Sequence, residues 1–214
     1  MKTILVYGDS LSWGAIPGTT QRLARNKRWP GIVEQTLDGK VRVIEENLNA
    51  RTTAFEDPSA RPGRNGQLLL RPLLETHAPL DLVIIMLGSN DLQDILAQTA
   101  PDVAANVKIL AQTVMNANWP GQENNSPYVL LVSPPLIVDP KLDLSEILSK
   151  APEKSKHFSK SYRSVAEELG CYFFDAATAT LPSPVDGLHL GEDEQAALGR
   201  ALAPVVRQIL GFID

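Results

Sequence analysis

The chain of 214 residues carries 20 lysines and arginines against 25 aspartates and glutamates, a net charge of −5, and 43% of its residues are hydrophobic. This size and composition are typical of a single globular domain, which we place at residues 1–214. The acidic balance and the absence of a basic cluster argue against nucleic acid as a partner, because binding to phosphates requires clustered lysine and arginine.

Two further absences restrict the location and the cofactor chemistry. No apolar run approaches the ~18 residues of a membrane span, and the chain begins without the apolar segment of a signal peptide. We therefore expect a cytoplasmic protein that does not associate with membranes. The single cysteine, Cys171, excludes an internal disulfide and leaves no cysteine cluster for a metal, so we expect neither a metal nor another cofactor.

The order of predicted elements along the chain indicates an α/β fold. Apolar runs predict five strands, at residues 3–7, 41–45, 81–87, 128–133 and 171–174. Helical patterns lie between or after them, at 29–38, 64–77, 101–117, 153–169 and 192–210. This alternation predicts right-handed βαβ units and a five-stranded parallel sheet between two layers of helices, with a flavodoxin-like strand order.

The first strand leads directly into a serine. Gly8-Asp9-Ser10 follows the apolar run 4–7, so the Ser10 hydroxyl is expected on a tight turn at the carboxyl end of a strand, where open α/β sheets bind ligands. The irregular stretches 14–28, 52–63 and 134–152 also follow strands and should gather over the same edge. Ser10 is therefore either a turn residue or a nucleophile.

A serine nucleophile needs a base, which is most often histidine, and the chain has three histidines. His77 at a predicted helix end and His157 on a basic helical segment are typical of surface residues. His189 instead lies in a loop just before the last helix, three residues after Asp186. This spacing suits an aspartate that orients a catalytic histidine, although a surface Asp–His pair would give the same pattern.

The third strand ends in Gly88-Ser89-Asn90-Asp91, which brings an amide side chain to the same edge as Ser10. Acyl transfer needs hydrogen-bond donors aimed at the developing oxyanion, and asparagine is a usual side-chain donor. The alternative is that these residues cap a following helix. We assign the oxyanion role to Asn90 and the structural role to Ser89 and Asp91.

Three segments in this order resemble the first, third and fifth sequence blocks of the GDSL or SGNH hydrolases: Gly-Asp-Ser-Leu-Ser at 8–12, Gly-Ser-Asn-Asp at 88–91 and Asp-Gly-Leu-His at 186–189. The stretches EENLNARTT and PLDLVIIMLGSND resemble most closely the arylesterase and acyltransferase branch known from mycobacteria. The resemblance implies a three-layer α/β/α sandwich and an enzyme that hydrolyses esters.

The resemblance also implies a role for each matched residue. Ser10 is the nucleophile, His189 the base and Asp186 the acid that orients the base. Asn90 and the backbone N–H of Ser10 then form part of an oxyanion hole.

The second block departs from the family pattern. The family usually has a glycine whose N–H completes the oxyanion hole, whereas this chain has Asn47-Leu48-Asn49-Ala50-Arg51. A backbone donor needs a suitable conformation more than a particular side chain, so Ala50 can serve. The resemblance to the arylesterase branch places the donor at Ala50, with Asn49 as the alternative.

The substrate is less well defined by the sequence. Apolar residues that flank the motifs are candidates for a pocket and equally for the core or a subunit contact: Trp13, Ile16, Trp29, Leu136, Ile137 and Leu188. We expect a small-molecule ester with a short acyl chain and an aryl or alkyl alcohol, with acyl transfer to alcohols as a further activity. The alternatives are a carbohydrate O-acetyl esterase and a non-catalytic binding module. The long loops and the resemblance also predict a homo-oligomer.

Overall fold

In a computed structural model, which describes residues 1–56, 62–118, 121–123 and 125–212, five strands form a parallel sheet. The strands are β1 (Lys2–Gly8), β2 (Val41–Asn47), β3 (Leu82–Met86), β4 (Tyr128–Ser133) and β5 (Tyr172–Asp175). Their order is β2-β1-β3-β4-β5, which is the flavodoxin-like order predicted from the sequence. The predicted strand ends are correct to within two residues.

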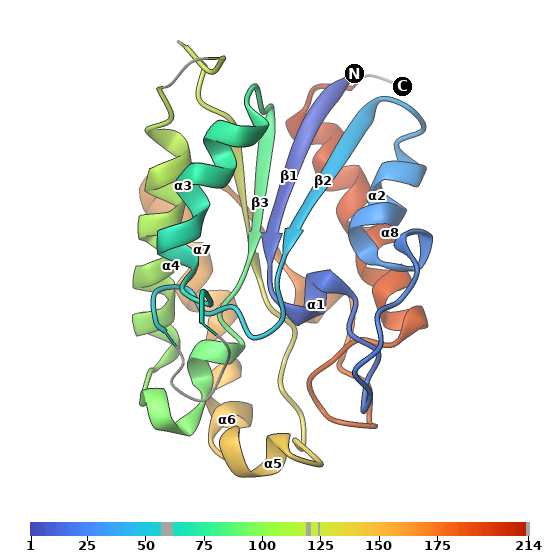
Figure 1. Ribbon diagram of the computed structural model, residues 1–214, viewed down its shortest axis with the longest axis vertical. Coiled ribbons are helices and arrows are strands. Elements are labelled where there is room, and N and C mark those ends of the chain that lie inside the picture. Colours follow the sequence, from blue (N-terminus) through green and yellow to red (C-terminus); the bar gives the residue numbers. More distant parts are fainter. Residues whose placement is uncertain (57–61, 119–120, 124, 213–214) are drawn as a thin grey trace.

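Helices cover both faces of the sheet and confirm the three-layer arrangement (Figure 1). One layer contains α3 (Gly66–His77), α4 (Ala100–Met115) and α7 (Phe158–Leu169), and the other contains α2 (Trp29–Thr36) and α8 (Glu192–Ile209). The remaining elements are short: α1 (Ser10–Trp13), α5 (Leu144–Ile147), α6 (Ala151–Ser155) and the 3-10 turns η1 (Arg25–Lys27), η2 (Asn90–Leu92), η3 (Asp94–Leu96) and η4 (Ala176–Thr178). No helix in the described ranges is long and apolar enough to cross a membrane.

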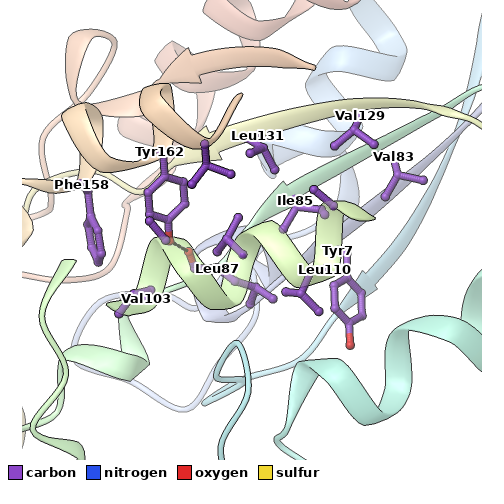
Figure 2. Packing of buried hydrophobic residues seen from close by; sticks show 14 of the residues in the cluster. Tyr7, Val83, Ile85, Leu87, Val103, Leu110, Val129, Leu131, Phe158 and Tyr162 are labelled. Carbon is purple, nitrogen blue, oxygen red and sulfur yellow. Dashed lines mark hydrogen bonds between the residues drawn. The ribbon is translucent and has the colours of Figure 1, made fainter. Parts of the chain in front are cut away.

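The apolar character of the strands follows from this double coverage. Successive side chains point to opposite faces, so Val83 and Ile85 of β3 pack toward α4 and α7, whereas Ile84 packs toward α2 and α8. Figure 2 shows the cluster on the α4 and α7 side of the sheet, to which Val83 and Ile85 of β3, Val103 of α4 and Tyr162 of α7 all belong. Burial on both faces removes any polar alternation from the sequence.

One predicted helix is interrupted in the structure. The segment predicted as a helix over 153–169 is divided into α6 and α7, with a turn at Lys156 and His157. The Ser155 hydroxyl accepts the N–H of Ile137 at 3.1 Å and donates to the carbonyl of Pro152. These bonds tie the end of α6 to the loop that follows β4, so the helical pattern does not continue unbroken.

The loops that follow β1, β2 and β4 gather at one edge of the sheet, below the arrowheads in Figure 1. This confirms the expectation for 14–28 and 134–152. The third predicted stretch, 52–63, includes residues 57–61, which lie outside the described residues. The carboxyl edge of the sheet is therefore the place to look for a site.

Candidate active site

The turn after β1 carries the Ser10 hydroxyl and holds it in place. A side chain at Gly8 would lie 2.4 Å from Ser12 Oγ, so only glycine fits there. Asp9 caps α1, because its Oδ1 accepts the N–H of Leu11 at 2.9 Å. Ser10 follows as the first residue of this short helix and is 7% exposed.

A chain of hydrogen bonds joins Ser10, His189 and Asp186. His189 Nε2 lies 3.0 Å from Ser10 Oγ, and His189 Nδ1 lies 2.9 Å from Asp186 Oδ2. Asp186 Oδ1 accepts the backbone N–H of Leu188 at 3.0 Å and of His189 at 2.9 Å, so the three-residue spacing folds the carboxylate back onto the ring. The N–H of Gly18 donates to Oδ2 at 3.0 Å. The other histidines are elsewhere, since His77 Nε2 contacts Glu46 Oε1 and His157 is exposed.

The charge on Asp186 fixes the tautomer of the histidine. Burial alone would raise the pKa of Asp186, but hydrogen bonds from the His189 ring and from two backbone N–H groups outweigh it and lower the pKa to about 2. An ionised carboxylate can only accept hydrogen bonds, so the ring carries its proton on Nδ1. In the neutral ring, Nε2 is then free to accept the proton of Ser10.

Asn90 lies between the serine turn and the loop after β2. Its Nδ2 is 3.0 Å from the carbonyl oxygen of Arg51 and 3.4 Å from Asp9 Oδ2. The chain enters this turn through Gly88, whose φ of +126° favours glycine. Any larger residue at this position would place its Cβ 2.3 Å from the Tyr162 hydroxyl. The amide of Asn90 is thus fixed at the same edge as Ser10.

Ala50 has the backbone conformation of a glycine. Its φ is +61°, in the left-handed region, within a turn closed by the N–H of Arg51 on the carbonyl of Leu48 at 3.1 Å. Within the described residues, the backbone N–H groups of Ala50 and Ser10 have no protein acceptor. Both are therefore available to a ligand.

Comparisons with known proteins identify the family of the chain. A model of the GDSL-like lipase/acylhydrolase family matches residues 6–197. The chain belongs to this family. This hydrolase is similar to a carbohydrate acetylesterase family member from Sinorhizobium meliloti, with 40% identity, coverage of 99% of this chain and 100% of the other, and a TM-score of 0.95.

Two further solved structures have similar values. The aryl esterase of M. smegmatis has 38% identity, coverage of 98% and 100%, and a TM-score of 0.94. A second carbohydrate acetylesterase from Sinorhizobium meliloti has 34% identity, coverage of 98% and 100%, and a TM-score of 0.93. No curated protein sequence matches the chain. Together with the family match, these neighbours identify an esterase of the SGNH type and confirm the resemblance inferred from the motifs.

The structure gives this GDSL-family esterase a contact that sequence reasoning missed. Neither Ser89 nor Asp91 makes a helix-capping side-chain bond at η2. Instead, both oxygens of the buried Asp91 carboxylate accept the N–H of Thr53 at 3.0 Å, and the Thr53 hydroxyl also lies against Oδ1. Burial is the main cause that raises the pKa of Asp91 to about 7, against the opposing effect of these bonds. No local pattern could identify Thr53, because 38 residues separate the partners.

Several residues expected in a substrate pocket lie in the core. Ile137 and Leu188 pack in the cluster beneath α4 and α7, and Trp29 packs in the opposite cluster. These three therefore do not wall an open pocket. Trp13, Ile16 and Leu136 are half-buried.

A pocket of about 530 Å³ does open beside His189 and Asp186. Its other walls are the segments Gly18–Gln21 and Leu142–Leu144. The lining combines leucine side chains with hydroxyl, amide and carboxylate groups. It therefore offers both apolar contact and hydrogen-bonding partners to a substrate next to the histidine.

Proposed function

We propose that the protein is a serine esterase that cleaves short-chain aryl or alkyl esters through an acyl-Ser10 intermediate. The observation that supports this proposal is the chain of hydrogen bonds from Ser10 Oγ through His189 to Asp186. His189 Nε2 takes the Ser10 proton as Oγ attacks the ester carbonyl, then gives that proton to the departing alcohol. Water, deprotonated by the same nitrogen, then releases the carboxylic acid and restores Ser10.

The negative charge that develops on the carbonyl oxygen needs donors already in place. We assign this role to Asn90 Nδ2 and the N–H groups of Ser10 and Ala50, with Asn49 as the alternative to Ala50. These groups belong to three loops at one sheet edge, and the two backbone N–H groups have no acceptor within the described residues. Donors held rigidly in this way stabilise the transition state without reorganising during the reaction.

The burial of Ser10 favours substrates with a short acyl chain. Ser10 is 7% exposed, and the side chain of His189 is 19% exposed, so little room surrounds the reacting oxygen. The larger pocket on the His189 side is suited to the alcohol part, because this histidine protonates the leaving oxygen.

The test is the release of p-nitrophenol from p-nitrophenyl acetate by the wild type, Ser10→Ala, His189→Ala and the double variant. We expect each single change to lower kcat by several orders of magnitude and the double variant to be little worse, because these residues act as one unit. His157→Ala, which changes an exposed histidine, is the matched control and should retain activity. Unchanged turnover in Ser10→Ala would refute the mechanism, whereas absence of turnover in the wild type would favour a non-catalytic binding role.

The polar groups of the pocket support a second candidate, the removal of O-acetyl groups from carbohydrates. Thr19, Thr20, Gln21 and Asp143 line the pocket and can hydrogen-bond to sugar hydroxyls. Two structural neighbours are named as carbohydrate acetylesterases. The rates on a peracetylated sugar and on phenyl acetate would distinguish the candidates. If the sugar is the preferred class, Thr20→Val should lower kcat/KM for the sugar and leave phenyl acetate unaffected.

Acyl transfer to alcohols follows from the same intermediate, because either water or an alcohol can attack acyl-Ser10. Leu142 and Leu144 give an alcohol apolar surface to bury beside His189. With vinyl acetate and benzyl alcohol in buffer, we expect more benzyl acetate than the molar ratio of alcohol to water predicts. A product ratio equal to that molar ratio would restrict the protein to hydrolysis.

A further inference from the structure

A buried carboxylate links the two loops that carry the proposed oxyanion donors. Asp91 and Thr53 are both fully buried, and Asp91 follows Asn90 directly. Thr53 N–H lies 3.0 Å from each carboxylate oxygen of Asp91, and the Thr53 hydroxyl bonds to the same group. The carbonyl of Arg51 accepts Asn90 Nδ2 at 3.0 Å, which provides a second link between the same two loops.

We infer that Asp91 and Thr53 are positioning residues that hold the Ala50 N–H and the Asn90 amide in the relative arrangement that an oxyanion requires. The inference rests on the proposed function. It assigns a task to Asp91, the last residue of Gly88-Ser89-Asn90-Asp91. Within the described residues, its neighbour Asn90 bonds to the loop after β2 at Arg51 alone, and Asp91 adds the attachment at Thr53.

The conformation of Ala50 is the reason why such a clamp is needed. An L-residue at φ +61° costs roughly 1–2 kcal/mol, so the turn persists only where its surroundings hold it on both sides. Before Ala50, the N–H of Leu48 donates to the carbonyl of Gly8 at 3.1 Å. After Ala50, the chain is held at Arg51, whose side chain donates to the carbonyl of Gly8 and whose carbonyl accepts Asn90 Nδ2, and then by the pair of Thr53 and Asp91.

The position of Asp91 depends on the hydrogen bonds that it receives from Thr53. A buried carboxylate is costly unless its oxygens receive hydrogen bonds, and within the described residues the side-chain bonds of Asp91 come from Thr53. The position of Thr53 is therefore coupled to Asp91, and the position of Asp91 is coupled through one peptide unit to Asn90. A displacement of about 1 Å at catalytic groups can cost roughly 100-fold in rate.

The test compares two substitutions of one buried side chain. Thr53→Val has nearly the same shape but lacks the hydroxyl, whereas Thr53→Ser keeps it. We expect Thr53→Val and Asp91→Asn to lower kcat on p-nitrophenyl acetate by roughly 10–100-fold with KM nearly unchanged, and Thr53→Ser to stay within about threefold. Rates are expressed per active serine, titrated with a fluorophosphonate, so that unfolded protein does not contribute.

A control variant separates positioning from a general loss of stability. Gln122 forms a buried pair of bonds with Leu80, from Leu80 N–H at 2.7 Å and to its carbonyl at 3.1 Å, at the amino-end edge of β3. Gln122→Ala should lower the thermal midpoint and leave kcat per active serine unchanged. If Thr53→Val behaves in the same way, the clamp is only structural and the inference is overturned.

A double-mutant cycle adds a readout that a structural role would not move. If the clamp acts through the oxyanion hole, the combined loss in Thr53→Val with Asn90→Ala will be smaller than the product of the single losses. A fully multiplicative loss would overturn the inference. Failure of the proposed function is distinguishable, because Ser10→Ala would then keep its activity, whereas failure of the clamp alone leaves Ser10→Ala inactive.

Discussion

Replacing Asp186 with asparagine tests the proposed triad without removing a side chain. Asp186 Oδ1 accepts two backbone N–H groups, from Leu188 and His189, so the amide oxygen of asparagine should take that position. The NH2 group then occupies the place of Oδ2, facing His189 Nδ1 and the N–H of Gly18. A donor there forces Nδ1 to become an acceptor, which moves the ring proton to Nε2 and leaves no lone pair facing Ser10.

The expected loss follows from this wrong tautomer. In serine hydrolases with a triad, the equivalent change costs about 10⁴ in kcat, or about 5.5 kcal/mol, while binding and oxyanion donors remain. We expect a loss of roughly 10³–10⁴ here, with KM changed far less. The measurement is kcat on p-nitrophenyl acetate per serine titrated with a fluorophosphonate, after circular dichroism has established that the variant is folded. A folded variant that keeps more than about a tenth of wild-type kcat would refute the role of Asp186.

Three further substitutions or conditions test separate parts of the site. Asn90→Ala should lower kcat by roughly 10²–10³ at nearly constant KM, and a raised KM with unchanged kcat would make Asn90 a substrate-binding residue instead. Ala50→Gly should raise the free energy of unfolding by up to about 1 kcal/mol, because the relief of the left-handed strain exceeds the cost of the added conformational entropy of the unfolded chain. The thermal midpoint should then rise by ~2–4 °C while kcat is unchanged, and a lower midpoint would contradict this. The pKa of Asp186 is lowered to about 2 in the folded protein, so its ionised carboxylate stabilises the fold at pH values above the pKa of the unfolded chain, and this stabilisation is lost as the pH falls toward 2. The difference in free energy of unfolding between the wild type and Asp186→Asn should therefore shrink by roughly 1–2 kcal/mol between pH 5 and pH 2. A difference that stays constant in urea titrations over this range would contradict the prediction.

The sequence predicts well where Ser10 and the proposed oxyanion donors lie, because their positions depend on local order and on strand neighbours. Gly8 pairs with Asn47 of β2 and with Met86 of β3, so the three strands end at the same level. Segments that follow those ends must therefore meet, and they carry Ser10, Ala50 and Asn90. Each lies two to four residues beyond its strand end, which leaves little freedom in where it can lie.

The sequence predicts the surroundings of the site less well because they depend on packing between distant segments. Ile137 and Leu188 are apolar and flank the motifs, as pocket residues often do, yet they are buried under α4 and α7. The pair of Asp91 and Thr53 was missed for the same reason. The sequence gives the chemical type of each side chain, but its contact partner depends on how loops from different strands pack against one another.

The approach of His189 to Ser10 also depends on a distant contact. His189 lies beyond β5, at the far edge of a sheet in which β1 is the second strand, so strand order alone would not bring it to the serine. Gln195 in α8 provides the connection, because its side chain accepts the N–H of Trp29 at 2.9 Å and donates to the carbonyl of Leu11 at 2.8 Å. Both bonds are buried, and Leu11 is the residue next to Ser10. The histidine loop thus enters a helix whose first turn is bonded to α1, the helix that carries Ser10. This buried link from behind the site, together with the bond from Gly18 N–H to Asp186 Oδ2, holds His189 beside Ser10.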